Sequence, residues 1–395
     1  MSLNFLRTAG FNVPLAGLLS ALSLTVASDA AQAAITYTEV RKIVDAEGAP
    51  SAADVAKMDE YLKKDFFGQF VKPATGETLP LLRKEFGNIV RGVGKNAAHD
   101  KFNALVFSYA GMVTKGKRFP AMSKYNALLL IGDLNEAEEV GKVKPYAPSL
   151  DLLIQVLAIP PNSEMAFLKP AALVGITRFA EEKAIPPAKL PAVSEALLKL
   201  VNETDAPAGR SASAHNFMRR SAAKALAAIG SPGPDNRVLN AFEAIAADPK
   251  GRLTLRCEMA QYIGALNIPP EAKVDSKALA NIIGHQVVEI CQQELDRAVE
   301  EKREPSRRVL MYALYSGGVG LSGISRSADK SVETTKFIKD VRDAVTSLYK
   351  LLDDPAKKST EIADAVTQTI ASLNSVLLAK PTPAALVAGG NSAMP

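Results

Sequence analysis

One short block constrains the fold of this chain more than any other. Residues 219–230 read Arg-Arg-Ser-Ala-Ala-Lys-Ala-Leu-Ala-Ala-Ile-Gly, with small and apolar residues spaced three and four apart. This spacing predicts an amphipathic helix whose apolar stripe is lined with alanine, so that a neighbouring helix can approach closely. The final glycine is typical of a helix end, because glycine adopts the left-handed conformation without strain.

Looser copies of this block recur, and in each an apolar helical segment ends near a glycine. Successive glycines lie roughly 34 to 55 residues apart, which fits helical-hairpin repeats with loop insertions. An arginine near several helix starts is unfavourable for the helix dipole, which suggests an acidic partner on the preceding repeat. The five glycines are Gly132, Gly175, Gly230, Gly264 and Gly317.

A second recurring motif is Ile-Pro-Pro, at residues 159–161, 185–187 and 268–270. Proline fits the first position of a helix but disrupts a helix interior. Each copy therefore predicts a boundary between two helices, with the isoleucine packed as an apolar anchor.

The block at 219–230 resembles the second helix of a HEAT repeat, and residues 256–264 are a fair second match. Looser matches extend the resemblance over about residues 121–320. The resemblance implies a right-handed α-solenoid of stacked antiparallel helical hairpins. It commonly implies protein binding, and it implies no catalytic residues.

Composition favours an all-α fold and a mixed surface. Ala and Leu, both strong helix formers, supply much of an apolar share of 47%. The only alternating stretch is residues 35–38, which is too short to predict a large sheet. The net charge is +5, and the basic residues are interleaved with 42 acidic ones, so a nucleic-acid-binding surface is not expected.

Five regions follow from these patterns: a signal peptide (1–33), an N-terminal helical region (34–120), HEAT-like repeats (121–330), a C-terminal helical hairpin (331–380) and a disordered tail (381–395). The terminal hairpin should cap the open apolar end of the repeats. Alternatively, it mediates oligomerisation. Its two apolar stripes are Phe337, Val341, Val345, Leu348 and Leu352, then Ile362, Val366, Ile370, Leu373 and Leu377.

The N-terminus is typical of a secretory signal peptide. Arg7 precedes an apolar run at residues 13–27, and Ala31-Gln32-Ala33 fits the small-x-small pattern after which signal peptidase cuts. We therefore expect a periplasmic or secreted protein, cleaved after about Ala33. The alternative is an uncleaved N-terminal anchor. No later apolar run is long enough to predict a transmembrane segment in the mature chain.

The sequence offers no motif for a metal or a cofactor. His99, His215 and His285 are not spaced as metal ligands, and each is expected at the surface or in packing. Residues 318–323 fit G-x-G-x-x-G, but the motif follows a predicted helix instead of a strand. It therefore predicts a flexible loop between helices and not a dinucleotide site.

A stretch rich in cations, residues 210–224, holds the candidate binding residues. On a concave face it could hold an anion, an acidic patch of another protein or an anionic glycan. The alternative is a basic helix face paired with a neighbouring repeat, in which the arginines act as struts. The candidates are Arg210, His215, Arg219, Arg220 and Lys224.

The two cysteines, Cys257 and Cys291, fall on two consecutive predicted helices. An exported chain can form a disulfide, and an antiparallel hairpin would bring them to comparable heights. The alternative is two buried thiols that pack as small apolar residues.

Taken with the lack of a catalytic motif, these features predict an exported, non-enzymatic scaffold that binds another protein or an envelope component. One alternative is an exported all-helical hydrolase or polysaccharide-active enzyme that uses an Asp/Glu pair. Another is a structural component of an envelope assembly.

Overall fold

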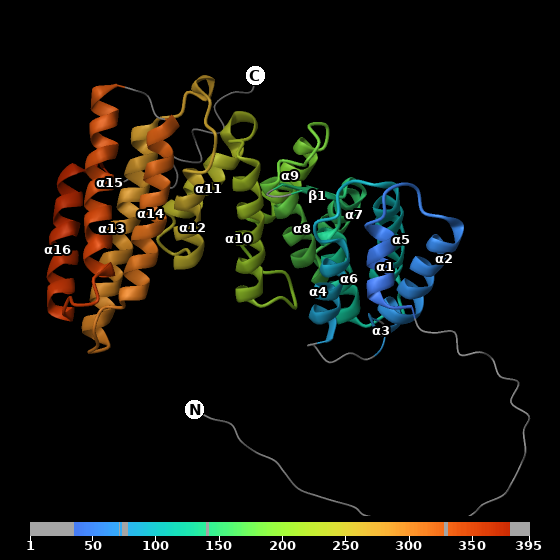
Figure 1. Ribbon diagram of the computed structural model, residues 1–395. Coiled ribbons are helices and arrows are strands. Elements are labelled where there is room, and N and C mark those ends of the chain that lie inside the picture. The colour runs from blue at the N-terminus through green and yellow to red at the C-terminus, as the bar shows by residue number, and fades with distance from the viewer. Residues whose placement is uncertain (1–34, 71, 73–77, 140–141, 328–330, 380–395) are drawn as a thin grey trace, which may run out of the picture.

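The structure is a computed structural model, and the regular secondary structure of its described residues is helical apart from one β-hairpin (Figure 1). This confirms the predicted all-α class. The predicted signal peptide and C-terminal tail lie outside the described residues. The described ranges are 35–70, 72, 78–139, 142–327 and 331–379.

Short helices form the N-terminal group. They are α1 (Tyr37–Val44), α2 (Ala52–Glu60), a π-helical turn (Tyr61–Phe66), α3 (Phe67–Phe70), α4 (Thr78–Val90) and α5 (Ala97–Lys115). Thr36 and Glu39 form a capping box at the start of α1, which satisfies backbone N–H groups that the helix leaves free. The alternating stretch at 35–38 therefore begins a helix.

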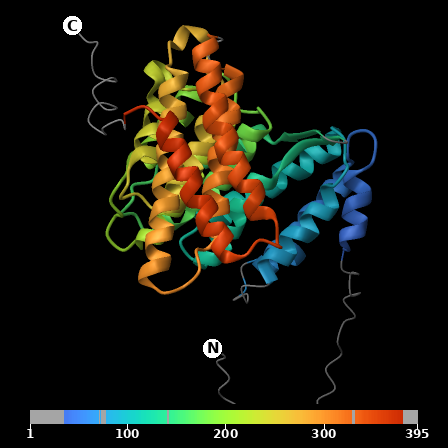
Figure 2. The same cartoon turned by 90° about the vertical axis from the view of Figure 1, so that its left-hand side faces the viewer.

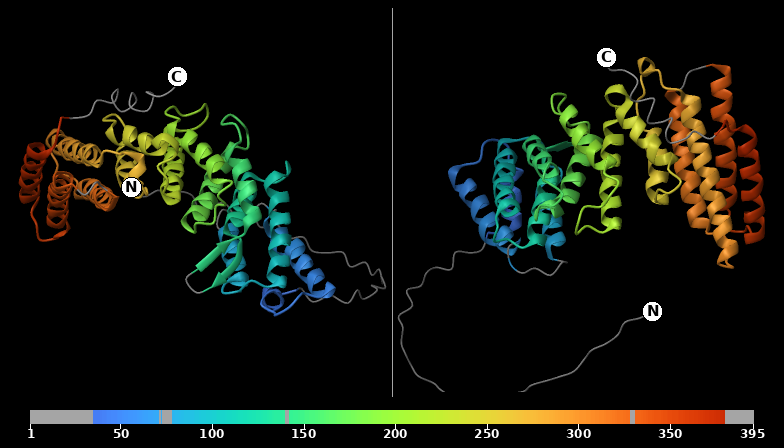
Figure 3. Two further views of the ribbon diagram at one scale, coloured as in Figure 1. Left: turned by 90° about the horizontal axis from the view of Figure 1, so that it is seen from above. Right: turned by 180° about the vertical axis from the view of Figure 1, so that it is seen from behind.

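The following helices pack as two rows (Figures 1 and 3). In the first row each helix packs against the next, and each helix of the second row packs on the first-row helix that follows it in sequence. The first row is α6 (Ala121–Asp133), α8 (Lys169–Glu181), α10 (Ala212–Ile229), α12 (Leu253–Ile263) and α14 (Arg307–Ser327). The second row is α7 (Ala147–Leu157), α9 (Leu190–Asn202), α11 (Arg237–Ala247) and α13 (Ser276–Glu300).

Two further helices, α15 (Val332–Asp353) and α16 (Ser359–Val376), complete the C-terminal end. Both pack on α13 and on each other, and α15 also packs on α14 (Figure 2). Their predicted apolar stripes are buried from Phe337 to Leu373, with Leu377 partly buried against the core. Among the described residues, no helix combines the length and the apolar character needed to cross a membrane.

The glycines of the recurring block allow close helix contact, as predicted. A Cβ atom added to Gly132 on α6 would lie 3.0 Å from the Cα atom of Gly175 on α8. Gly230 follows α10 with a φ of +81°, the left-handed conformation expected at a helix end. The predicted helix ends at Gly175 and Gly317 are wrong, because both glycines lie inside longer helices where they make room for a neighbour.

The G-x-G-x-x-G motif at 318–323 lies inside α14, so the predicted flexible loop is also wrong. A Cβ atom on Gly320 would lie 2.2 Å from the carbonyl oxygen of Ala260, and one on Gly323 would lie 1.9 Å from that of Gly264. The motif is therefore a small-residue stripe that lets the backbones of α14 and α12 meet.

All three Ile-Pro-Pro motifs lie between helices, as predicted. Ile185 is buried, and Ile159 and Ile268 are partly buried against the core. The β-hairpin was not predicted. Its strands, β1 (Asn135–Glu139) and β2 (Lys142–Pro145), pair antiparallel. An ion pair of 2.6 Å joins Glu136 and Lys144 across the hairpin, where the sequence shows no apolar alternation.

The contact between α12 and α14 gives a stability prediction. Gly320→Ala should lower the free energy of unfolding by about 1–3 kcal/mol, because the added methyl overlaps the backbone of α12. Gly318→Ala, on the same helix, is the matched control, since its added methyl would meet nothing closer than 3.9 Å. It should raise the stability by about 0.5–1 kcal/mol through helix propensity. Urea unfolding followed by circular dichroism measures both, and equal effects would contradict the packing.

Candidate functional site

The predicted basic residues lie on α10 and in the loop before it, and each contacts this chain's own atoms. His215 is buried, and its Nε2 lies 2.8 Å from the carbonyl oxygen of Glu203. The Arg210 guanidinium lies 3.4 Å from the other ring nitrogen. Arg219 is also buried and donates from Nε to the carbonyl oxygen of Val201 at 2.9 Å.

The remaining two cations tie neighbouring helices of the first row together. Arg220 forms an ion pair with Glu258 on α12. Lys224 forms one with Glu181 on α8, at 3.0 Å. The basic residues therefore do not converge on one cavity, and only Arg220 of the five lines a described one.

Buried or partly buried arginines recur in the first row with one shared role. Arg178 on α8 donates to the carbonyl oxygen of Gly132 at 2.8 Å, and Arg256 on α12 donates to that of Ala246 at 3.2 Å. With Arg219, each reaches carbonyl groups near the end of another helix. These carbonyls have no partner within their own helix and carry partial negative charge. The arginines that open the blocks at 219–230 and 256–264 thus have a structural role, whereas Arg178 follows its block.

The described residues form one cavity with aromatic and cationic walls, which we call the Tyr–Arg groove. Its volume is about 780 Å³. α14 contributes most of the wall, α12 and α10 one side, and α15 the other. The lining residues are Arg220, Leu253, Thr254, Arg307, Arg308, Val309, Met311, Tyr312, Tyr315 and Tyr349.

Behind one wall of the groove, Glu258 is held by three groups. It accepts from Arg220, from the hydroxyl of Tyr312 at 3.0 Å and from that of Tyr262 at 3.4 Å. Burial, and then the nearby carboxylate, raise the pKa values of Tyr262 and Tyr312 well above that of free tyrosine. The hydroxyls therefore stay protonated at neutral pH. This network is a structural part of the wall, because both oxygens of the Glu258 carboxylate already accept hydrogen bonds.

The rim of the groove is open and positively charged. The rings of Tyr315 and Tyr349 lie 6.3 Å apart, and Tyr315 is 51% exposed. Arg307 donates to the carbonyl oxygens of Asp354 and Lys357, at 2.9 and 2.7 Å. Sequence reasoning missed this rim. Its signal was the pair of arginines that opens α14, followed at helical spacing by two tyrosines.

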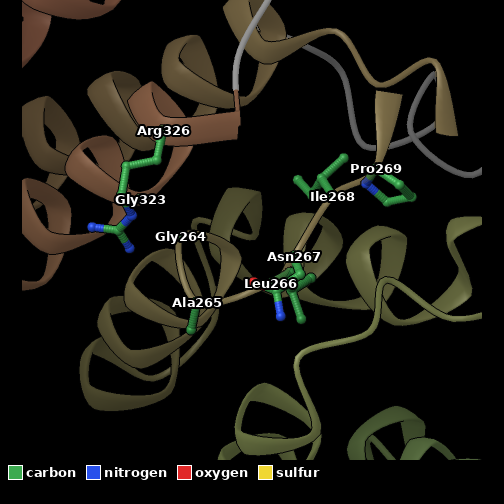
Figure 4. A pocket seen from close by; sticks show the side chains of 8 residues that line it. All are labelled: Gly264, Ala265, Leu266, Asn267, Ile268, Pro269, Gly323 and Arg326. Carbon is green, nitrogen blue, oxygen red and sulfur yellow. The ribbon is translucent and has the colours of Figure 1, made fainter. Parts of the chain in front are cut away.

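Two other cavities offer fewer side chains suited to binding a ligand. The first, of about 320 Å³, lies between the end of α12 and α14 (Figure 4). Its walls are mainly the turn after α12, with Arg326 reaching across from α14. The second, of about 610 Å³, lies between α15 and α16 and carries Asp340 and Asp343 at one side.

The other histidines do not form a site. His99 is fully buried, and burial lowers its pKa. His285 lies 2.8 Å from the carbonyl oxygen of Leu378. Within the described residues, no group of histidine, cysteine and carboxylate side chains is placed to hold a metal ion.

Comparison of the chain with protein-family models, with curated proteins and with solved structures finds no match. The site is therefore interpreted from its own geometry.

Cys257 and Cys291 are both buried and unbonded in the structure. Burial raises the pKa of each thiol to about 12, so the reactive thiolate is scarce at neutral pH. We expect no thiol to react with Ellman's reagent at pH 8 in the folded protein and both to react in guanidinium chloride. The protein should be tested without prior reduction. Thiols that appear only after reductant is added would show a disulfide instead.

Proposed function

We propose that this chain is an exported, non-enzymatic scaffold that binds another protein. The binding face would be the face of the first row that carries Val174, Phe217 and Arg220. We further propose that the two rows are a right-handed, HEAT-like α-solenoid, with α15 and α16 as its cap. The observation that carries the proposal is the Tyr–Arg groove, an open cavity with aromatic and cationic walls and no catalytic arrangement.

Exposed apolar side chains on α8 and α10 support a binding face. Val174 on α8 and Phe217 on α10 are 49% and 51% exposed. Each lies two helical turns before a member of the Glu181–Lys224 ion pair, so all four share one face of the row. Arg220 continues the same face toward the groove. Exposed apolar side chains that share a face with charged ones are suited to contact with another protein.

The residue types of the groove also favour a protein partner. Tyrosine and arginine are enriched among the residues that contribute most to protein–protein binding. Each offers a large contact surface together with hydrogen-bond donors. A hydrolase would need a carboxylate free to exchange protons, whereas Glu258 beside the groove accepts three hydrogen bonds.

Site-specific photo-crosslinking tests the binding face. A benzoylphenylalanine placed at Phe217 or at Tyr315, in cells that naturally contain the protein, should give one discrete crosslinked species. The same residue at Val299, 78% exposed on the second-row helix α13, is the matched control and should give none. Equal crosslinking at all three positions, or none at any, would contradict the proposal.

Export gives a separate prediction. The protein purified from the periplasm or the medium should begin at Ala34, because cleavage is proposed after Ala33. Intact-mass spectrometry measures this directly. A membrane-bound form that keeps residues 1–33 would identify the uncleaved anchor instead.

A further inference from the structure

We propose that the Tyr–Arg groove recognises a carboxylate next to an aromatic or branched apolar group, presented by a segment of the partner protein. This inference rests on the proposed function and names the chemistry of the partner. Arg308 would contact the carboxylate, and the tyrosines and aliphatic residues would enclose the apolar group.

The charges of the groove favour an anion. Arg220 is neutralised by Glu258. Arg307 donates to two carbonyl oxygens, and no ion pair with a carboxylate is found for it within the described residues. Arg308 is exposed, and no hydrogen bond or ion pair from its side chain is found within the described residues. The lining includes no acidic side chain, so the cavity carries net positive charge.

The position of Arg307 and Arg308 strengthens the preference of the groove for an anion. Arg307 and Arg308 are the first two residues of α14, where the helix dipole places partial positive charge. The first turn of α14 contains no acidic residue. Carbonyl oxygens at the C-cap of α15 and in the loop after it hold Arg307, whereas the side chain of Arg308 has no such partner among the described residues. A bound carboxylate would interact favourably with both the guanidinium and the helix end.

The walls define the second half of the ligand. Leu253, Val309 and Met311 give an aliphatic surface, and Tyr315 and Tyr349 expose ring surface at the rim. A cavity of about 780 Å³ is within the usual range for organic ligands, and so admits one large side chain with its neighbours. Aromatic rings pack on tyrosine and on guanidinium faces alike.

Three small probes share a naphthalene ring and differ in charge, so they separate the contribution of charge to binding from that of the apolar ring. They are 2-naphthoate, neutral 2-naphthalenemethanol and cationic 2-naphthylmethylammonium, each titrated into the full chain and followed by saturation-transfer NMR and calorimetry. We expect 2-naphthoate to bind most tightly, and its affinity to fall with added salt. Equal binding of the neutral probe, or tighter binding of the cationic one, would overturn the proposal.

Three variants assign the binding to the groove. Arg308→Gln should weaken 2-naphthoate binding about tenfold or more, because a hydrogen bond between charged groups is lost. Tyr315→Ala should weaken all three probes alike. Arg118→Gln removes an exposed arginine in the loop between α5 and α6 and should change nothing. Unchanged binding by Arg308→Gln would overturn the assignment, and thermal melts establish that each variant is folded.

The outcome separates this inference from the proposed function. A crosslinked partner at Phe217 or Tyr315 without a preference for 2-naphthoate overturns the carboxylate chemistry and leaves the scaffold role in place. Binding of 2-naphthoate that depends on Arg308, with no crosslinked partner, supports the groove chemistry and overturns the protein partner, so that a free aromatic carboxylate becomes the ligand.

Discussion

Contact between the backbones of neighbouring first-row helices is the constraint on which this fold depends. Gly132 meets Gly175 between α6 and α8, and Gly320 meets Ala260 between α14 and α12. Each glycine inside a helix costs roughly 0.5–1 kcal/mol relative to alanine, so α14, with four of them, is a poor helix in isolation. Close packing against α12 offsets that cost. The groove depends on the same contact between α12 and α14, because α14 supplies most of its lining residues.

Buried and partly buried guanidinium groups also hold the helices of the first row together. Removing a charge from water is costly unless hydrogen bonds compensate it. Arg178, Arg219 and Arg256 meet that condition at carbonyl groups near helix ends, and Arg256 adds an ion pair with Glu289 at 2.6 Å. Side chains used in this way are not available to a ligand. Much of the positive charge that the sequence places in its recurring blocks therefore serves folding.

The all-α class, the helix breaks and the C-terminal stripes were predictable, because each depends on local spacing. The length of α14 was not predictable. Its glycines are typical of a loop in the sequence, and their role in contact with the backbone of α12 appears only in the folded structure. The same applies to Gly175. The β-hairpin has no apolar pattern, and its ion pair becomes visible only when β1 and β2 face each other. Of the groove, only Arg220 was among the predicted binding residues, because the residues from α14 form a cavity only when α10, α12 and α15 pack around them.

The contrast between Arg220 and Arg308 explains why the groove, and not the basic stretch before it, is the better candidate for binding. Both side chains line one cavity. Arg220 is neutralised by a carboxylate that two tyrosines also hold, so displacing Glu258 would leave a mostly buried acid without its partner. Arg308 stands at a helix start, where folding alone disfavours a cation. Arg308 is exposed and has no hydrogen-bond or ion-pair partner among the described residues, at a position where the dipole opposes a cation, and these features carry the proposal of an anion bound there.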